Sequence, residues 1–306
     1  MIIKVLGSAA GGGFPQWNCA CPNCRRARTG DGSVRSRKND SLAISPDGIR
    51  WALLNAGPDI CHQLEAESSL HPGPSLRSSP IEAVLLTDAE LDHTTGLLQL
   101  RQGSALDVYG PPPVLGALSD GFPIRRIVEP FASYRWIELI AGDSFPLFGG
   151  RLEVRPFHLG NSPPLYVRSS LSNLTAGESP SWVLGYRITD ETTQGVVVYA
   201  PGIETWSQTL EKQLEEADCI FLDGTFWHSE ELCSLGVSER NALDMGHLPV
   251  AGTAGSASQL AKFPARRKVY IHINNTNPML VENSVERRSL TAQGIEVGFD
   301  GMEMEV

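Results

Sequence analysis

Four side chains that can bind a metal ion or a proton lie close together in the segment TDAELDH: Asp88, Glu90, Asp92 and His93. The segment follows an apolar run that ends at Thr87, which is typical of a strand leading into a loop. Carboxylates this close repel one another unless a cation neutralises them, and Asp, Glu and His bind first-row metals. The pattern favours a metal-ligand cluster, although a capped helix start with an acidic first turn explains the same residues and is compatible with it.

A second group of metal-binding side chains consists of Cys19, Cys21 and Cys24 in the segment CACPNC. Three thiols at this spacing suit a tetrahedral ion, usually Zn²⁺, which would close a loop that little else holds. A redox pair or incidental thiols are the alternative. No fourth ligand follows nearby, so it must come from elsewhere in the chain or from water. We predict a structural zinc knot at about residues 17–30.

The elements that must position these groups alternate along the chain. Short β-rich runs such as IEAVLLTD, GVVVYAPG, CIFLDG and KVYIHI alternate with helical patterns over Leu210–Ala217 and Ala251–Phe263. This mixture predicts an α/β architecture with more than one sheet. No Pro- or Ser-rich linker divides the chain, so we expect a single domain over residues 1–306.

Composition limits the partners and the compartment. The chain has 35 acidic and 25 basic residues, and a net charge of -10 argues against a nucleic-acid partner. No apolar stretch approaches the roughly 20 residues of a membrane-spanning helix, and the N-terminal residues lack a secretion-signal pattern. We therefore expect a cytoplasmic protein that binds small molecules or peptides and uses its cysteines for metal binding rather than for disulfides.

The segment TDAELDH resembles the signature T-H-x-H-x-D-H of the metallo-β-lactamase superfamily, with Thr87, Asp92 and His93 in place and with Asp88 and Glu90 where histidines are usual. Further segments resemble the superfamily in its order. GDSFPLFGGRLEVRPFHLG resembles the hairpin that ends in a ligand histidine, and KVYIHINN resembles the strand that carries the last ligand. CACPNC resembles the zinc knot of the phosphodiesterase branch. The resemblance implies an αβ/βα sandwich, two β-sheets packed face to face with helices outside, and His158 and His272 as metal ligands.

The departures from the superfamily pattern change the expected chemistry. The aspartate that bridges two metals in the superfamily is replaced within the segment Ala200–Gly202. Of the usual first metal site only His158 remains, whereas Asp92, His93 and His272 of the second all remain. Two histidines and one carboxylate form the facial triad of non-haem Fe(II) oxygenases, which leaves positions open for O₂ and substrate.

Within the superfamily the chain resembles the PqqB family of pyrroloquinoline quinone (PQQ) biosynthesis, through SAAGGGFPQWNCACPNC, TDAELDHTTGLL, FLDGTFW, MGHLP and HINNTNPML. This resemblance implies an Fe(II)- and O₂-dependent hydroxylation of the tyrosine ring in a Glu-Tyr peptide that is derived from the PQQ precursor. It also implies other PQQ biosynthesis proteins as partners. Two alternatives stay open: carriage of PQQ or its precursor towards the periplasm, and a mononuclear metal-dependent hydrolase. Zn²⁺ competes well for such ligands, so it is expected to replace iron in some preparations.

The resemblance assigns roles to the remaining polar residues. Glu90 and Asp88 are expected to act as general bases or to bind a second cation with His158, and His247 is expected to transfer protons. Asp223, at a strand end before a glycine, is expected to be a ligand or to orient a ligand histidine. Asn275 occupies the position of the fourth knot ligand, but an amide oxygen is a poor Zn²⁺ ligand beside three thiolates.

Overall fold

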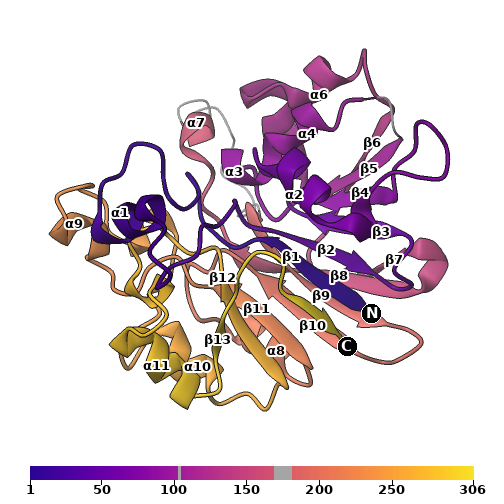
Figure 1. Cartoon of the computed structure of the whole chain (residues 1–306). Coiled ribbons are helices and arrows are strands. Elements are labelled where there is room, and N and C mark those ends of the chain that lie inside the picture. The colour runs from indigo at the N-terminus through magenta and orange to yellow at the C-terminus, as the bar shows by residue number, and fades with distance from the viewer. Residues whose placement is uncertain (103–104, 169–180) are drawn as a thin grey trace.

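The computed structural model describes residues 1–102, 105–168 and 181–306. In this part of the chain, the strands form two seven-stranded mixed sheets that pack face to face with helices on their outer faces (Figure 1). The predicted αβ/βα sandwich is confirmed. None of the described helices is long and apolar enough to cross a bilayer.

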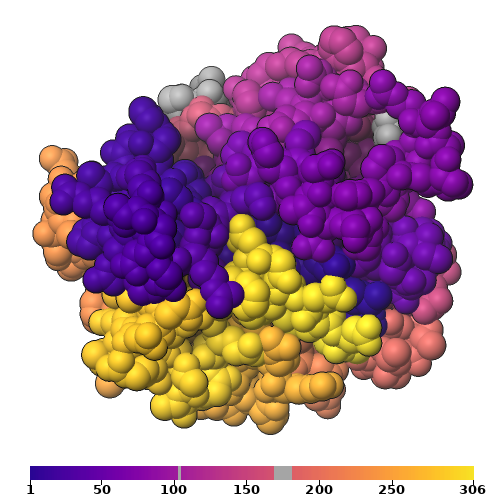
Figure 2. Space-filling view, viewed as in Figure 1, coloured from indigo at the N-terminus to yellow at the C-terminus, as the bar shows by residue number. Residues whose placement is uncertain are grey.

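The first sheet has the strand order β14-β1-β2-β3-β4-β5-β6. Its strands are β1 (Ile2–Gly7), β2 (Ser41–Ser45), β3 (Trp51–Leu54), β4 (Ile81–Leu85), β5 (Leu106–Gly110), β6 (Tyr134–Glu138) and β14 (Glu303–Glu305). The pairs from β14 to β3 are antiparallel and those from β3 to β6 are parallel. The C-terminal segment therefore closes one edge of the sheet by pairing with the N-terminal strand, and the two segments lie against each other in Figure 2.

The second sheet has the strand order β13-β12-β11-β10-β9-β8-β7. Its strands are β7 (Phe145–Leu147), β8 (Leu152–Gly160), β9 (Val183–Asp190), β10 (Val196–Ala200), β11 (Cys219–Asp223), β12 (Arg267–Ile271) and β13 (Glu296–Val297). The strands from β10 to β13 are parallel, and those from β7 to β10 are antiparallel. Each sheet thus combines a parallel half with an antiparallel half.

The helices lie outside the two sheets. They are α1 (Pro22–Thr29), α2 (Ile60–Ala66), α3 (Leu91–Thr94), α4 (Gly96–Gln99), α5 (Pro112–Gly116), α6 (Ile124–Val128), α7 (Leu165–Arg168), α8 (Gln208–Leu214), α9 (Glu231–Ser234), α10 (Ser256–Leu260) and α11 (Val285–Ala292). Short helical turns occur at Ser68–Leu70, Ala117–Gly121, Phe148–Gly150, Leu243–Met245 and Pro278–Leu280. Buried residues of α2, α4 and α6 pack on the first sheet, and those of α8, α10 and α11 pack on the second (Figure 1).

The helical pattern predicted over Ala251–Phe263 forms a helix only at α10. Gly252 adopts a φ of 99°, in the left-handed region, and Gly255 is the N-cap residue. A helix cannot continue through such a glycine, so the segment before Ser256 is a turn.

Successive side chains of a strand point to opposite faces of its sheet, and those on the inner faces form the core between the two sheets. In β2, Leu42 and Ile44 face the second sheet, whereas Ala43 packs under the helices. Buried residues of both sheets form one continuous apolar layer. Because this layer is shared and the chain ends pair with each other, we propose that residues 1–306 fold as one domain.

Both parallel halves end at the same edge of the sandwich. The segments that follow β4, β11 and β12 carry Asp92, Thr225 and His272, and these three residues line one pocket. Working groups of parallel sheets collect at the carboxyl ends of the strands, and the polar segments found by sequence are there.

We predict that Leu42→Ala lowers the free energy of unfolding by about 2–5 kcal/mol, because the side chain is completely buried between the sheets and its loss leaves a cavity. Urea denaturation measures the change. Leu76→Ala is the control, since that leucine is fully exposed and should change stability by less than about 0.5 kcal/mol. Equal losses in the two variants would contradict the assignment of the core.

Candidate metal centre

Asp92, His93 and His272 form a compact group of potential metal ligands. One ligand atom of each lies within 4.8 Å of the others. Asp92 Oδ2 is 3.4 Å from His272 Nε2 and 3.7 Å from His93 Nε2. His272 has a φ of 52°, a left-handed conformation that is costly for this residue type and that clusters at functional sites. The structure therefore brings together the three residues of the predicted facial triad.

Two glycines allow the chain to approach Asp92 closely. A Cβ atom on Gly57 would lie 2.3 Å from the Asp92 carbonyl oxygen, and one on Gly11 would lie 3.4 Å from Asp92 Oδ2. The first contact is impossible for any larger residue, so Gly57 is required where the loop after β3 packs on α3.

Hydrogen bonds fix the orientation of His93. Its Nδ1 lies 2.8 Å from both oxygens of Asp88. An ionised carboxylate only accepts hydrogen bonds, so Nδ1 carries a proton and Nε2 is the nitrogen that a metal ion could bind. This Nε2 atom is buried and has no hydrogen-bond partner among the described residues. A buried nitrogen without a partner is unfavourable unless a cation binds it, so the site fits a metal ion.

His272 is oriented in the same way. Thr225 Oγ1 lies 2.6 Å from Asp223 Oδ1 and 2.8 Å from His272 Nδ1. The threonine hydroxyl has one proton, which it donates to the carboxylate, and so it accepts the His272 Nδ1–H. His272 Nε2 is therefore also free for a metal ion.

The charges of the group favour a cation. Burial opposes protonation of His93, but the charges of Asp88 and Asp92 outweigh burial and raise its pKa to about 10. Burial likewise opposes ionisation of Asp92, yet the neighbouring imidazoles of His93 and His272 lower its pKa. The carboxylates thus hold a proton at His93 that a metal ion would displace.

A second group, formed by Asp223, His247 and His272, is better explained as a hydrogen-bond network. His247 Nδ1 lies 2.7 Å from Asp223 Oδ2, and Nδ1 of His272 is already bound to Thr225. The rings of His247 and His272 stack with centroids 5.3 Å apart. Burial opposes protonation of His247, but the Asp223 charge raises its pKa. His247 is thus held beside the triad, and Asp223 orients it.

These groups line a cavity of about 300 Å³. Its walls include Phe226, Leu165 and Met245, and its polar lining includes Glu90, Arg168 and Arg240. Glu90 is open to solvent at the rim, yet partial desolvation and then the charges of Asp88 and Asp92 raise its pKa to about 7. The cavity combines an apolar wall with a few polar groups, as small-molecule sites do.

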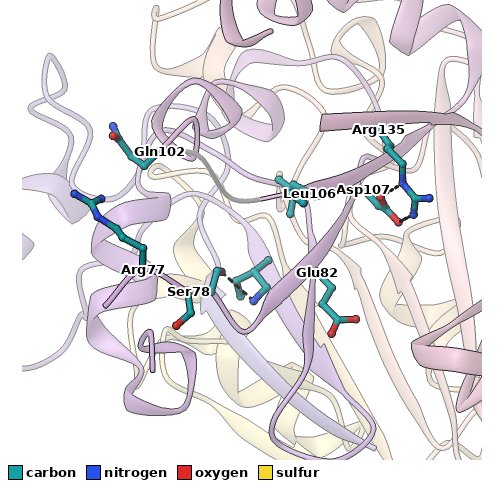
Figure 3. A pocket seen from close by; sticks show the side chains of 10 residues that line it. Arg77, Ser78, Glu82, Gln102, Leu106, Asp107 and Arg135 are labelled. Atoms are coloured by element: carbon teal, nitrogen blue, oxygen red, sulfur yellow. Dashed lines mark hydrogen bonds and ion pairs between the residues drawn. The ribbon is translucent and has the colours of Figure 1, made fainter. Parts of the chain in front are cut away.

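A larger hollow of about 900 Å³ lies elsewhere. Its residues come from the segments before β4 and β5 and from the first residues of β4, β5 and β6, at the opposite ends of these strands from the triad. Figure 3 shows Arg135 paired with Asp107, while Arg77 and Glu82 point in different directions. Because its polar groups do not converge, we assign no chemistry to this hollow.

Two predicted site residues make contacts that the sequence did not predict. The Asp88 carboxylate, predicted as a base, accepts from Thr87 Oγ1 at 2.7 Å and from the Glu90 backbone N–H at 2.9 Å, besides His93. These contacts make Asp88 the group that orients His93, and its role as a general base stays a prediction. His158, predicted as a ligand, has its Nδ1 3.0 Å from Ser181 Oγ and belongs to neither ligand group in the described part of the chain.

The cysteine cluster forms as predicted from the spacing. The sulfur atoms of Cys19, Cys21 and Cys24 lie within 4.8 Å of one another. Cys21 caps α1 by accepting the Cys24 backbone N–H at 3.4 Å. Asn275 Nδ2 is 3.1 Å from Cys19 Sγ and 3.3 Å from Cys24 Sγ, so its amide occupies the place of a fourth ligand. Burial raises the pKa of Cys24 to about 11, and a bound cation would be needed to keep this thiol ionised.

Several pocket residues had not been predicted from the sequence. Thr225 lies within the quoted segment FLDGTFW, but nothing in its neighbours shows that it contacts His272. Arg168, Arg240 and Glu204 come from segments far apart in the sequence and reach the cavity only through the fold. No spacing rule connects them.

The fold and the site define a metallo-β-lactamase-type protein. Residues 50–273 match the Beta-lactamase superfamily domain. The chain is also similar, at 18% identity and a TM-score of 0.69 over its whole length and 96% of the other chain, to a diphosphatase of the PhnP family, which supports the fold alone.

Closer similarities identify the branch. The coenzyme PQQ synthesis protein B of Pseudomonas savastanoi pv. phaseolicola is 41% identical over 100% of both chains, and that of Nitrosococcus oceani is 41% identical over 99% of both. The crystal structure of Zn²⁺-bound PqqB from Methylobacterium extorquens superposes with a TM-score of 0.90 at 37% identity, covering both chains completely. The chain belongs to the coenzyme PQQ synthesis protein B (PqqB) family.

We predict that the two metal centres can be emptied separately. His93→Ala should lose the pocket ion and keep the knot ion, whereas Cys24→Ser should lose the knot ion and keep the pocket ion. Metal content per chain, measured by mass spectrometry after loading with Zn²⁺ and dialysis, checks both variants. Unchanged metal content in His93→Ala would contradict the pocket site.

Proposed function

We propose that this chain acts in PQQ biosynthesis as an Fe(II)-dependent hydroxylase of the tyrosine ring in a Glu-Tyr peptide. The observation that carries the proposal is the triad of Asp92, His93 and His272, in which a buried imidazole nitrogen has no hydrogen-bond partner in the described part of the chain. Two histidines and one carboxylate are the ligand set of non-haem iron oxygenases.

In this proposal Asp92, His93 and His272 hold the pocket ion, and Cys19, Cys21 and Cys24 hold a structural Zn²⁺ with Asn275 alongside. When bound, Fe(II) supplies the redox chemistry that O₂ activation requires. Zn²⁺ competes well for the same ligands, so protein isolated without iron is expected to contain Zn²⁺ there.

The chain itself positions the substrate and moves protons. Phe226 and Leu165 on the cavity wall pack against an aromatic ring and exclude water. The Glu90 carboxylate at the rim accepts the phenolic proton. His247, whose Nδ1 is held by Asp223, is placed to donate or accept a proton at its other nitrogen.

The proposed compartment and partner proteins follow from the sequence and the family. The cysteines of the chain are unpaired, as in a reducing compartment, and we place the reaction in the cytoplasm. Other PQQ biosynthesis proteins would deliver the peptide and consume the product.

A hydrolase is the second candidate, because the fold is shared with a diphosphatase of the PhnP family. The oriented His247 would suit hydrolysis as well as hydroxylation. The segment Ala200–Gly202 offers no carboxylate for a second metal, so such a hydrolase would use a single ion. Carriage of PQQ or its precursor is the third reading, and it would require no chemistry from the triad.

We predict that protein stripped of metal and reloaded anaerobically with Fe(II) hydroxylates a Glu-Tyr dipeptide after addition of O₂ and ascorbate. Insertion of one oxygen atom reduces the other to water and consumes two electrons, which ascorbate supplies. Mass spectrometry should detect a tyrosine ring heavier by one oxygen atom.

His93→Ala should reduce the yield of this product to the level of the protein-free reaction, and Zn²⁺-loaded protein should form none. Unchanged dipeptide with Fe(II), together with cleavage of phosphodiesters by the Zn²⁺ form, would favour the hydrolase. Tight quinone binding that survives metal removal would favour the carrier.

A further inference from the structure

A continuous chain of buried hydrogen bonds leads away from the metal ligand His93. It passes through Asp88 to Thr87, whose Oγ1 donates to Asp88 Oδ2 at 2.7 Å. Thr87 contacts Asn55, which in turn contacts Tyr199. Every residue in this chain is at most 5% exposed, so water does not compete for its hydrogen bonds.

Asn55 lies at the centre of this series of hydrogen bonds, and the orientation of its side-chain amide is fixed. Its Oδ1 accepts the Thr87 backbone N–H at 2.9 Å, so the amide nitrogen must point the other way. Nδ2 then donates one proton to Thr87 Oγ1 at 2.9 Å and the other to the Tyr199 hydroxyl at 3.1 Å. Asn55 adopts a φ of 64°, which asparagine tolerates better than most residues.

The hydroxyl groups of Thr87 and Tyr199 each donate a hydrogen bond to a carboxylate. The Tyr199 hydroxyl donates to Asp40 Oδ2 at 2.5 Å, as Thr87 donates to Asp88. Asp40 is completely buried, and its other oxygen has no hydrogen-bond partner among the described residues. The two N–H groups of Asn55 therefore orient two hydroxyls toward two buried carboxylates, one of which holds His93.

These hydrogen bonds also join the two sheets. Asn55 and Thr87 follow β3 and β4 of the first sheet, whereas Tyr199 belongs to β10 of the second. Tyr199 lies directly opposite Tyr186 of β9, and both side chains enter the layer between the sheets. The position of β10 is thus linked to the orientation of a metal ligand in the opposite sheet.

We propose that Asn55 and Tyr199 are positioning residues for the pocket metal, because they fix the Asp88 carboxylate that orients His93. The inference rests on the metal site of the proposed function but not on the reaction. It assigns a role to two residues that lie outside the cavity and touch no substrate.

Co²⁺ binding tests the proposal. Thiolate-to-cobalt charge-transfer absorption reports Co²⁺ in the cysteine knot, and the ligand-field bands of the pocket ion report Co²⁺ at the triad. The knot signal is therefore an internal reference for the pocket signal in each variant. In Tyr199→Phe we expect the Co²⁺ affinity of the pocket to fall about tenfold, as is common when an outer partner of a ligand histidine is removed. The pocket ligand-field bands should shift, and the knot signal should not change.

Tyr186→Phe is the matched control. Tyr186 is equally buried, but its hydroxyl donates only to the Leu86 carbonyl, at 2.5 Å. This variant loses one buried hydrogen bond without affecting Asn55, so its pocket affinity should stay within twofold of the wild type. Asn55→Asp keeps the side-chain shape and removes both N–H donors, and it should weaken pocket binding at least as much as Tyr199→Phe.

Equal pocket affinity and unchanged bands in Tyr199→Phe would overturn the proposal. So would an equal loss in Tyr199→Phe and Tyr186→Phe that follows their loss of stability in urea, since that would show a purely structural role. Failure of the wild type to bind Co²⁺ in the pocket would instead refute the metal site itself.

Discussion

The hydrogen bond from His93 Nδ1 to the Asp88 carboxylate is the interaction on which the site depends. It fixes the proton on Nδ1, turns Nε2 toward Asp92 and leaves that nitrogen buried without a partner. Asp88 stands where the superfamily signature has a ligand histidine. The exchange removes a ligand from the first metal site and gives the second site a carboxylate that orients its histidine. Together with Glu90 and the loss of the bridging aspartate at Ala200–Gly202, this exchange favours the proposed mononuclear site.

The sandwich makes this arrangement possible because each sheet supplies part of the site. Asp92 and His93 follow β4 of the first sheet, and His272 follows β12 of the second. Thr225, after β11, holds His272 as Asp88 holds His93. The ligands therefore meet only if the sheets keep their relative position, which the shared apolar layer and the bonds of Tyr199 maintain.

The sequence allowed the fold and the triad to be predicted, since strand runs, the spacing of Asp92 and His93 and the segment around His272 are local patterns. It did not show that Asp88, which lines the cavity as expected, also bonds to His93, because a turn sequence does not show which imidazole a carboxylate contacts. The network of Asn55 and Tyr199 went unseen for a related reason. Asn55 and Tyr199 are 144 positions apart, and no local pattern in the sequence shows that they come into contact when the two sheets pack together.

Anomalous diffraction from crystals loaded anaerobically with Fe(II), recorded on both sides of the iron absorption edge, tests the central claim most directly. The account predicts a single iron peak within roughly 2.0–2.2 Å of Asp92, His93 Nε2 and His272 Nε2, distances usual for such ligands. A zinc peak should lie among the three cysteines. A second iron peak beside Asp88 and His158, or one iron bound by Asp223 and His247, would contradict a mononuclear triad.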